Sequence, residues 1–174
     1  VQLREKESST REFVERAIRL KEVLTPYGVP LIINDRVDVA LAANADGVHV
    51  GQSDMPYEMV KRLLPEGKII GLSVESPEQV LEANNYDLDY VAASPVFSTT
   101  TKTNTIVEWG LDGLRWIRSV SRHPLVAIGG IHSNNVASIC KAGADSVAVI
   151  SAIVSADDPE RAARELLEKS GEPH

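Results

Sequence analysis

The sequence contains a single cysteine, Cys140, and no long apolar run. One cysteine cannot form an internal disulfide, so we expect a reducing compartment and an inert, buried thiol. No stretch of about 18 apolar residues is present to span a membrane, and no charged and then apolar leader opens the chain. These absences predict a cytoplasmic protein without a membrane partner.

The sequence also has no excess of basic residues. Lys and Arg total 18 against 25 Asp and Glu, which gives a formal net charge of −7. This balance excludes a general nucleic-acid-binding surface, but it is compatible with a local basic pocket for a small phosphate. The length of 174 residues and the 43% hydrophobic content predict one globular domain over residues 1–174.

Short β-branched runs alternate with amphipathic stretches along the whole chain. This alternation is typical of βα units around a parallel sheet whose two faces are both covered. Helix starts are predicted at Ser9 or Thr10, at Ser76 and at Ser133, where residues suited to N-capping precede the amphipathic stretches. Seven strands are predicted, over residues 1–6, 30–34, 47–50, 68–73, 90–93, 125–128 and 146–150.

One phrase occurs twice, as Ala-Asn-Ala-Asp-Gly-Val at 43–48 and as Ala-Gly-Ala-Asp-Ser-Val at 142–147. Repetition of a helix exit and strand entry favours a (β/α)8 TIM barrel over an open sheet. Such a barrel needs eight units, and seven are present. We therefore expect a first βα unit that is missing before Val1, because a seven-stranded barrel would leave an open sheet edge.

In such barrels the catalytic groups follow the carboxyl ends of the strands. Alternation places Gln2, Arg4 and Lys6 on one side of the first strand, although a solvated charged strand end would look the same. Asp35 follows the second strand and could cap the helix beginning near Val37. Asp54 follows the third strand, and two neighbouring carboxylates suit Mg²⁺.

Other polar residues follow the remaining strands. His49 interrupts an apolar strand, and we interpret it as a packed, hydrogen-bonded wall residue rather than a ligand. The segment 94–103 is rich in hydroxyls and contains Lys102, which suits phosphate, although an ordinary Ser/Thr loop has the same composition. Gly129, Gly130 and Ser151 follow the last two strands, a common position for a phosphate site.

Taken in order, the motifs resemble the thiamine-phosphate synthase family, which joins the pyrimidine and thiazole halves of thiamine. The motifs are QLREK, INDRVDVALAANADGVHVGQSD, IGLS, SPVFSTTTK, AIGGI and AVISAI. The match runs from Val1 to about Ala156, and the family has a strand and a helix before its QLREK strand.

The resemblance implies a role for each matching position. Asp35 and Asp54 would bind Mg²⁺. Arg4, Lys6 and Lys102 would stabilise the departing diphosphate of the pyrimidine substrate. The implied substrate-binding residues are Gln2, Leu3, Arg4, Glu5, Lys6, Asn34, Ser73 and Lys102 for the pyrimidine diphosphate, and Thr99, Thr100, Thr101, Gly130, Ile150 and Ser151 for the thiazole phosphate.

The sequence departs from the family pattern at Glu75, where the family and its relatives often have a histidine. In the similar thiazole tautomerase that histidine is regarded as catalytic, so Glu75 argues against a tautomerase. The expected partners are small phosphate substrates, and the oligomeric state is left open, a homo-oligomer included. Two alternatives to a synthase remain: a thiazole tautomerase, and a non-catalytic thiamine-phosphate binder.

Overall fold

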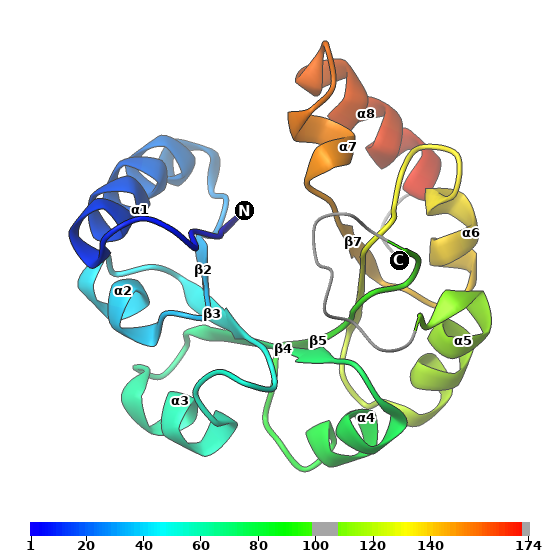
Figure 1. Ribbon diagram of the computed structural model, residues 1–174, viewed down its shortest axis with the longest axis horizontal. Helices are drawn as coiled ribbons and strands as arrows, with labels where there is room; N and C mark the ends of the chain where they lie inside the picture. Colours follow the sequence, from blue (N-terminus) through cyan, green and yellow to red (C-terminus); the bar gives the residue numbers. More distant parts are fainter. Residues whose placement is uncertain (99–107, 172–174) are drawn as a thin grey trace. The chain divides into compact units, whose positions relative to one another are not determined.

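The computed structural model describes residues 1–98 and 108–171 as an α/β fold in which parallel strands alternate with helices (Figure 1). The chain divides into two compact units, Val1–Ser73 and Val74–His174. Across the described ranges, no helix has both the length and the apolar character needed to cross a membrane.

The first unit contains four parallel strands whose spatial order follows the chain. Register pairs Gln2 with Ile32, Asn34 with His49, and His49 with Gly71. Its elements are β1 (Gln2–Leu3), α1 (Thr10–Leu24), the 3-10 helix η1 (Thr25–Tyr27), β2 (Ile32–Asn34), α2 (Val37–Ala42), β3 (Gly47–Val50), α3 (Tyr57–Leu63) and β4 (Ile69–Val74), whose last residue begins the second unit.

In the part of the second unit that the structure describes, three parallel strands again follow chain order. Register pairs Val91 with Leu125 and Val126 with Ser146. Its elements are α4 (Pro77–Ala83), β5 (Tyr90–Ala93), α5 (Gly110–Val120), β6 (Leu125–Ile128), α6 (Val136–Lys141), β7 (Ser146–Ala148), α7 (Ser151–Val154) and α8 (Pro159–Ser170).

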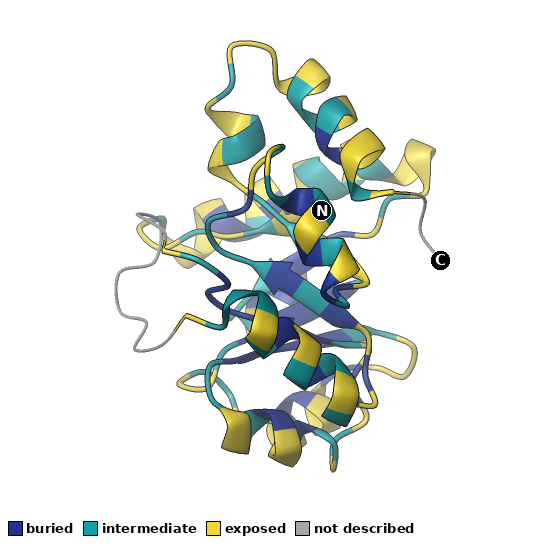
Figure 2. Cartoon of the chain, turned by 90° about the vertical axis from the view of Figure 1, so that its right-hand side faces the viewer, coloured by how far each residue is buried: buried dark blue, intermediate teal, exposed yellow. Residues whose placement is uncertain are grey.

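Burial explains why these segments form these elements. All four residues of β3 are buried, as expected for a strand covered on both faces. In α1 the buried side chains are Phe13 and Ala17, four residues apart on one face of the helix. Figure 2 shows the same division, with buried strands and helices whose outer faces are exposed.

The seven strands of the described residues and the helices between them confirm the predicted βα alternation, but several predicted boundaries were wrong. The strand predicted over residues 1–6 covers only Gln2–Leu3, which pair with Ile32 and Ile33 of β2. The helix predicted to start at Ser133 starts at Val136. Cys140, predicted to be buried, is only half-buried.

Two helix-start predictions are confirmed. Ser9 caps α1 through a capping box, in which its hydroxyl accepts from the backbone N–H of Glu12 and the Glu12 carboxylate accepts from the N–H of Ser9. Ser76 caps α4 by accepting from the N–H of Gln79. Each cap satisfies an N–H group that the helix itself leaves without a partner.

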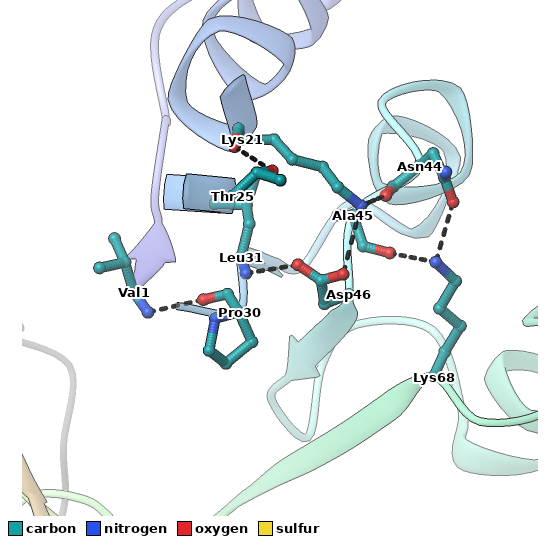
Figure 3. Close-up of polar contacts among 9 residues, drawn as sticks. All are labelled: Val1, Lys21, Thr25, Pro30, Leu31, Asn44, Ala45, Asp46 and Lys68. Carbon is teal, nitrogen blue, oxygen red and sulfur yellow. Dashed lines mark hydrogen bonds and ion pairs between the residues drawn. The ribbon is translucent and has the colours of Figure 1, made fainter. Parts of the chain in front are cut away.

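The first copy of the repeated phrase forms a polar clamp at the amino ends of β2 and β3 (Figure 3). The Asp46 carboxylate accepts from the N–H of Leu31 at 2.8 Å and from Lys21 Nζ at 3.2 Å. Lys68 Nζ donates to the carbonyl of Ala45 at 2.7 Å and to Asn44 Oδ1 at 2.9 Å. Asn44 has a positive φ of 48°, the conformation that reverses the chain after α2.

The second copy builds the same clamp in the second unit. The Asp145 carboxylate accepts from the N–H of Leu125 at 2.7 Å and from Arg118 Nη1 at 3.0 Å. Gly143, with φ 109°, takes the place of Asn44. Each clamp therefore ties a strand entry to the preceding strand and to a cation on an earlier helix.

We predict that Asp46→Asn lowers the free energy of unfolding at pH 7 by about 1–2 kcal/mol, the range for hydrogen bonds to a charged group that is partly exposed. Burial alone would raise the pKa of Asp46, but the bonds from Leu31 and Lys21 and the charges of Lys21 and Lys68 outweigh it and lower that pKa. Stability from a lowered pKa is present above the unfolded value and is lost as the pH falls through the folded value.

Urea unfolding of wild type and variant at pH 7, and at steps below about pH 5, checks this prediction. The difference between the two proteins should shrink as the pH falls. Asp112→Asn removes an exposed carboxylate paired with Arg115 and serves as the control, with an expected change below about 0.5 kcal/mol. If the difference in free energy of unfolding between wild type and Asp46→Asn did not change with pH, the charge of Asp46 would not contribute to the clamp.

Candidate functional site

Asp35 lies directly after β2 in a strained conformation. Its φ is 64°, a region that side chains other than glycine rarely adopt, although Asp and Asn tolerate it best. The N–H of Arg36 donates to the carbonyl of Asn34 at 2.8 Å, which makes Asp35 the middle of a three-residue turn. The N–H of Asp35 donates to the carbonyl of His49 at 2.8 Å, so the turn is attached to β3.

The alternative reading of Asp35 as a helix cap was wrong. The N-cap residue of α2 is Arg36, and no side chain caps that helix. The Asp35 carboxylate instead pairs with Lys6 Nζ and keeps only 19% of its surface exposed. Its position is therefore set by a strained turn and by an ion pair, not by the needs of the helix.

Asp54 lies at the end of the tight turn that follows β3. Its backbone N–H donates to the carbonyl of Gly51 at 3.2 Å, and its Oδ2 accepts from the N–H of Gly51 at 2.7 Å. Burial raises the pKa of Asp54, and the neighbouring Asp35 carboxylate raises it further, against the lowering effects of the Gly51 N–H and Lys6. The first unit thus brings together the two aspartates that the sequence singled out.

Two adjacent carboxylates beside one ammonium fit a hard cation. Mg²⁺ is commonly held by one or two carboxylates and completes its shell with water and substrate phosphate. Among the residues that the structure describes, no group of three or more His, Cys, Asp or Glu side chains could hold a metal. Two carboxylates alone would leave most of the coordination shell of such a cation to water and substrate phosphate.

The remaining QLREK residues differ in burial and in their contacts. Gln2 and Arg4 are exposed, and Leu3 is half-buried. The Glu5 carboxylate accepts from Ser8 Oγ at 2.7 Å and pairs with Arg16 of α1 at 2.8 Å. Of the three predicted cations, Arg4, Lys6 and Lys102, the structure places Lys6 beside Asp35, while the roles of Arg4 and Glu5 stay predictions.

Asn34 and Ser73 share one face of the strands in the first unit. Register pairs Asn34 with His49 and His49 with Gly71, and Ser73 lies two residues beyond Gly71. Alternate residues of a strand point the same way, so the side chains of Asn34, His49 and Ser73 lie on the same face. Ser73 Oγ lies 2.8 Å from His49 Nε2, which confirms the interpretation of His49 as a hydrogen-bonded wall residue.

In the second unit, the paired glycines after β6 make room for the chain that follows β5. A Cβ on Gly129 would lie 2.7 Å from Pro95 Cβ, and one on Gly130 would lie 2.8 Å from Phe97 Cβ and 2.9 Å from the Ser98 carbonyl. The N–H groups of Val96 and Phe97 donate to the carbonyls of Ile128 and Gly129. Close backbone packing therefore explains both glycines, and a phosphate role for Gly130 stays a prediction.

The other predicted thiazole-phosphate residues lie partly outside the described ranges. Ile150 is the N-cap residue of α7 and Ser151 is its first residue, and both are exposed. Thr99, Thr100, Thr101 and Lys102 fall within residues 99–107, which the structure does not describe. Ser98 Oγ donates to Glu108 Oε1 across that interval.

Comparison with known proteins identifies the family of the chain. A family model described as thiamine monophosphate synthase matches residues 1–153. The chain belongs to this family. The resemblance found in the sequence motifs is therefore confirmed.

Relatives in the thiamine monophosphate synthase family are similar over most of the chain. The thiamine-phosphate synthase of Albidiferax ferrireducens is 53% identical over 166 residues, which are 95% of this chain and 76% of the relative. That of Vibrio parahaemolyticus is 50% identical over 167 residues, 96% of this chain and 82% of the relative.

Solved structures agree with the family assignment. Thiamine phosphate pyrophosphorylase from Pyrococcus furiosus superposes with a TM-score of 0.89 at 42% identity, over 97% of this chain and 81% of that chain. The 3-hexulose-6-phosphate synthase from Salmonella typhimurium reaches a TM-score of 0.73 at 22% identity, over 92% of this chain and 81% of that chain, and shares the fold alone.

Sequence reasoning missed one contact at the predicted substrate residues. Gln52 Nε2 donates to the carbonyl of Ser73 at 2.6 Å, so the residue after Gly51 holds the end of β4. No periodic signal indicates such a bond, because Gln52 lies in a turn. Only its place two residues before Asp54 in the same motif could have marked it.

Proposed function

We propose that the chain is a Mg²⁺-dependent thiamine-phosphate synthase. This transferase would condense 4-amino-2-methyl-5-(diphosphooxymethyl)pyrimidine with a thiazole phosphate to give thiamine phosphate and diphosphate. The observation that carries the proposal is the adjacent pair Asp35 and Asp54 beside Lys6, within a chain of the thiamine monophosphate synthase family. The parallel strands in chain order, each followed by a helix, support a (β/α)8 barrel as the full architecture.

The chemical problem is the charge on the leaving group. The bond from the pyrimidine methylene carbon to the diphosphate oxygen breaks, and that carbon bonds to the thiazole nitrogen. Mg²⁺ held by Asp35 and Asp54 would neutralise charge that develops on the departing diphosphate. Lys6, which Asp35 holds beside the pair, would offer an ammonium to the same phosphates.

The pyrimidine would be bound by groups of the first unit. Asn34 and Ser73 present an amide and a hydroxyl from one face of the strands. The thiazole phosphate would be bound by Gly130, Ile150 and Ser151 of the second unit, together with Thr99 to Thr101, and Lys102 would add a second ammonium for the diphosphate. No side-chain nucleophile is needed for this reaction, because the electron-rich aminopyrimidine tolerates positive charge on its methylene carbon.

An assay of the purified chain with both substrates tests the proposal. We expect diphosphate and thiamine phosphate to appear in equal amounts, with Mg²⁺ required and EDTA abolishing turnover. Product formation at the same rate in EDTA would reject the metal requirement. A folded chain that releases no diphosphate would reject the synthase.

The same assay separates the two alternatives. A thiazole tautomerase would rearrange the thiazole phosphate without the pyrimidine substrate and without diphosphate release. A binding protein would give heat on titration with thiamine phosphate but no turnover. The proximity of the two aspartates favours the synthase, since neither alternative requires a diphosphate-bound cation.

A further inference from the structure

Two atoms of Ser73 make hydrogen bonds with residues of β3 and of the turn that follows it. His49 Nε2 lies 2.8 Å from its hydroxyl oxygen, and Gln52 Nε2 donates to its carbonyl at 2.6 Å. His49 and Ser73 are 7% and 8% exposed, so their hydrogen bond is shielded from water. A serine needs neither contact to continue a strand, which suggests that its side-chain orientation matters.

The strand register explains how the imidazole reaches Ser73. His49 is paired with Gly71 on β4, and Ser73 lies two residues further along the same face. Because Gly71 has no side chain, the ring can lie across β4 without a clash. On its other side His49 is paired with Asn34 of β2, so the histidine stands between two proposed pyrimidine-binding residues.

A hydroxyl that serves as a substrate contact gains from being oriented beforehand. Serine carries one proton and two lone pairs and can rotate among three staggered positions. A fixed partner at 2.8 Å selects one of these positions and directs the remaining hydrogen-bonding capacity elsewhere. Because the Ser73 hydroxyl is already fixed, substrate binding does not lose the free energy that would be needed to order it.

We propose that His49, assisted by Gln52, is a positioning residue that orients the Ser73 hydroxyl toward the pyrimidine diphosphate. This inference rests on the proposed synthase function. His49 acts through Ser73 and contacts no reacting atom, so its effect depends on the serine being present.

A double-mutant cycle tests this dependence. His49→Leu and Ser73→Ala should each lower kcat/KM for the pyrimidine diphosphate by roughly tenfold or more, as loss of an oriented polar contact does. The double variant should be no worse than Ser73→Ala alone, because without the hydroxyl nothing is left to orient. His49→Gln places an amide near the position of Nε2 and should retain activity within a few-fold of wild type. The KM for the thiazole phosphate should not change.

His123→Gln is the matched control. His123 is also buried, 5% exposed, and its ring nitrogens lie 3.1 Å from the Leu88 carbonyl and 2.9 Å from the Ala83 carbonyl. Its replacement should lower thermal stability and leave kcat/KM unchanged below the unfolding transition. Should His49→Leu fail to fold, Gln52→Met replaces it in the cycle, since Gln52 is exposed.

Losses that multiply in the double variant would overturn the proposal, as would a folded His49→Gln that is as impaired as the leucine variant. Both outcomes require an active wild type. If wild type releases no diphosphate, the synthase function itself fails, and the two failures are thereby distinguished.

Discussion

Asp54→Asn is expected to lower kcat/KM by at least about 100-fold, while the folded chain becomes as stable as wild type or more so. Activity falls because an amide is a far weaker ligand for Mg²⁺ than a carboxylate. Stability is kept because Asn Oδ1 can accept the same bond from the N–H of Gly51. The substitution also removes a charge that Asp35 repels.

The pH dependence gives the sign of this stability effect. Burial and the Asp35 carboxylate raise the pKa of Asp54 above its ordinary value, so its charged form is disfavoured in the folded chain. The protonated form of Asp54 therefore stabilises the folded chain at low pH, and this contribution is lost as the pH rises through the folded pKa. Urea unfolding without Mg²⁺ should therefore show the advantage of Asp54→Asn at pH 7 and its disappearance on acidification.

Asp38→Asn is the control, since Asp38 is an exposed carboxylate that pairs with Arg36 in the same motif. It should keep activity within about twofold, as expected for an exposed residue without a catalytic role. Asp35→Asn should lose activity like Asp54→Asn, because it too replaces a carboxylate by an amide. The variant should still fold, because Asn tolerates the left-handed backbone of this position. An Asp54→Asn variant with full Mg²⁺-dependent turnover would contradict the metal site.

Gly47→Ala is expected to lower the free energy of unfolding by about 3 kcal/mol or more. Gly47 is buried in β3 and paired with Ile69 of β4. A Cβ there would lie 2.3 Å from the Ile69 carbonyl oxygen and 2.6 Å from Ile69 Cβ. The Ile69 carbonyl is fixed by the pairing of β3 with β4 and cannot rotate away, so the two strands would have to separate.

The second repeat supplies the control for this prediction. Ser146 takes the place of Gly47 in the repeated phrase and is exposed. Ser146→Ala should change stability by less than about 0.5 kcal/mol. Thermal and urea unfolding of both variants compare the two positions, and a Gly47→Ala variant with wild-type stability would show that β3 and β4 are not so closely paired.

The sequence predicted the order and type of the elements because each depends on local signals. β-branched runs marked the strands, and Ser9 and Ser76 marked helix starts that the structure confirms. The sequence did not predict the ends of elements that depend on residues far away in the chain. The alternation of Gln2, Arg4 and Lys6 suggested a long strand, but β1 pairs with β2 only at Gln2 and Leu3.

The start of α6 shows a second kind of failure. Ser133 had the right chemistry for a cap, yet Asn135 holds the preceding turn. Its Oδ1 accepts from the N–H of His132, and its Nδ2 donates to the carbonyl of Gly130. Both side chains favour turns, and the choice between them depends on the position of Gly130.

The sequence predicted that Asp35 and Asp54 lie close together, but it did not predict the turns that hold them. Two carboxylates after neighbouring strands indicated a shared cation site, since parallel strands end at the same edge. The strained turn at Asp35 and the bond from Gly51 to Asp54 have no signature in the composition. The turn at Asp35 is attached to β3 by the bond from its N–H to the His49 carbonyl, whereas the bond from Gly51 to Asp54 lies within a local turn.

The repeated Asp46 and Asp145 clamps precede their strands, whereas Asp35 and Asp54 follow theirs. In the proposed synthase, β3 would therefore have a residue that maintains the fold before the strand and a residue that binds the metal after it. A laboratory selection for new substrates could randomise the residues that follow the strands and keep both clamp aspartates fixed. Such a library should retain more folded members than one that varies residues at both ends.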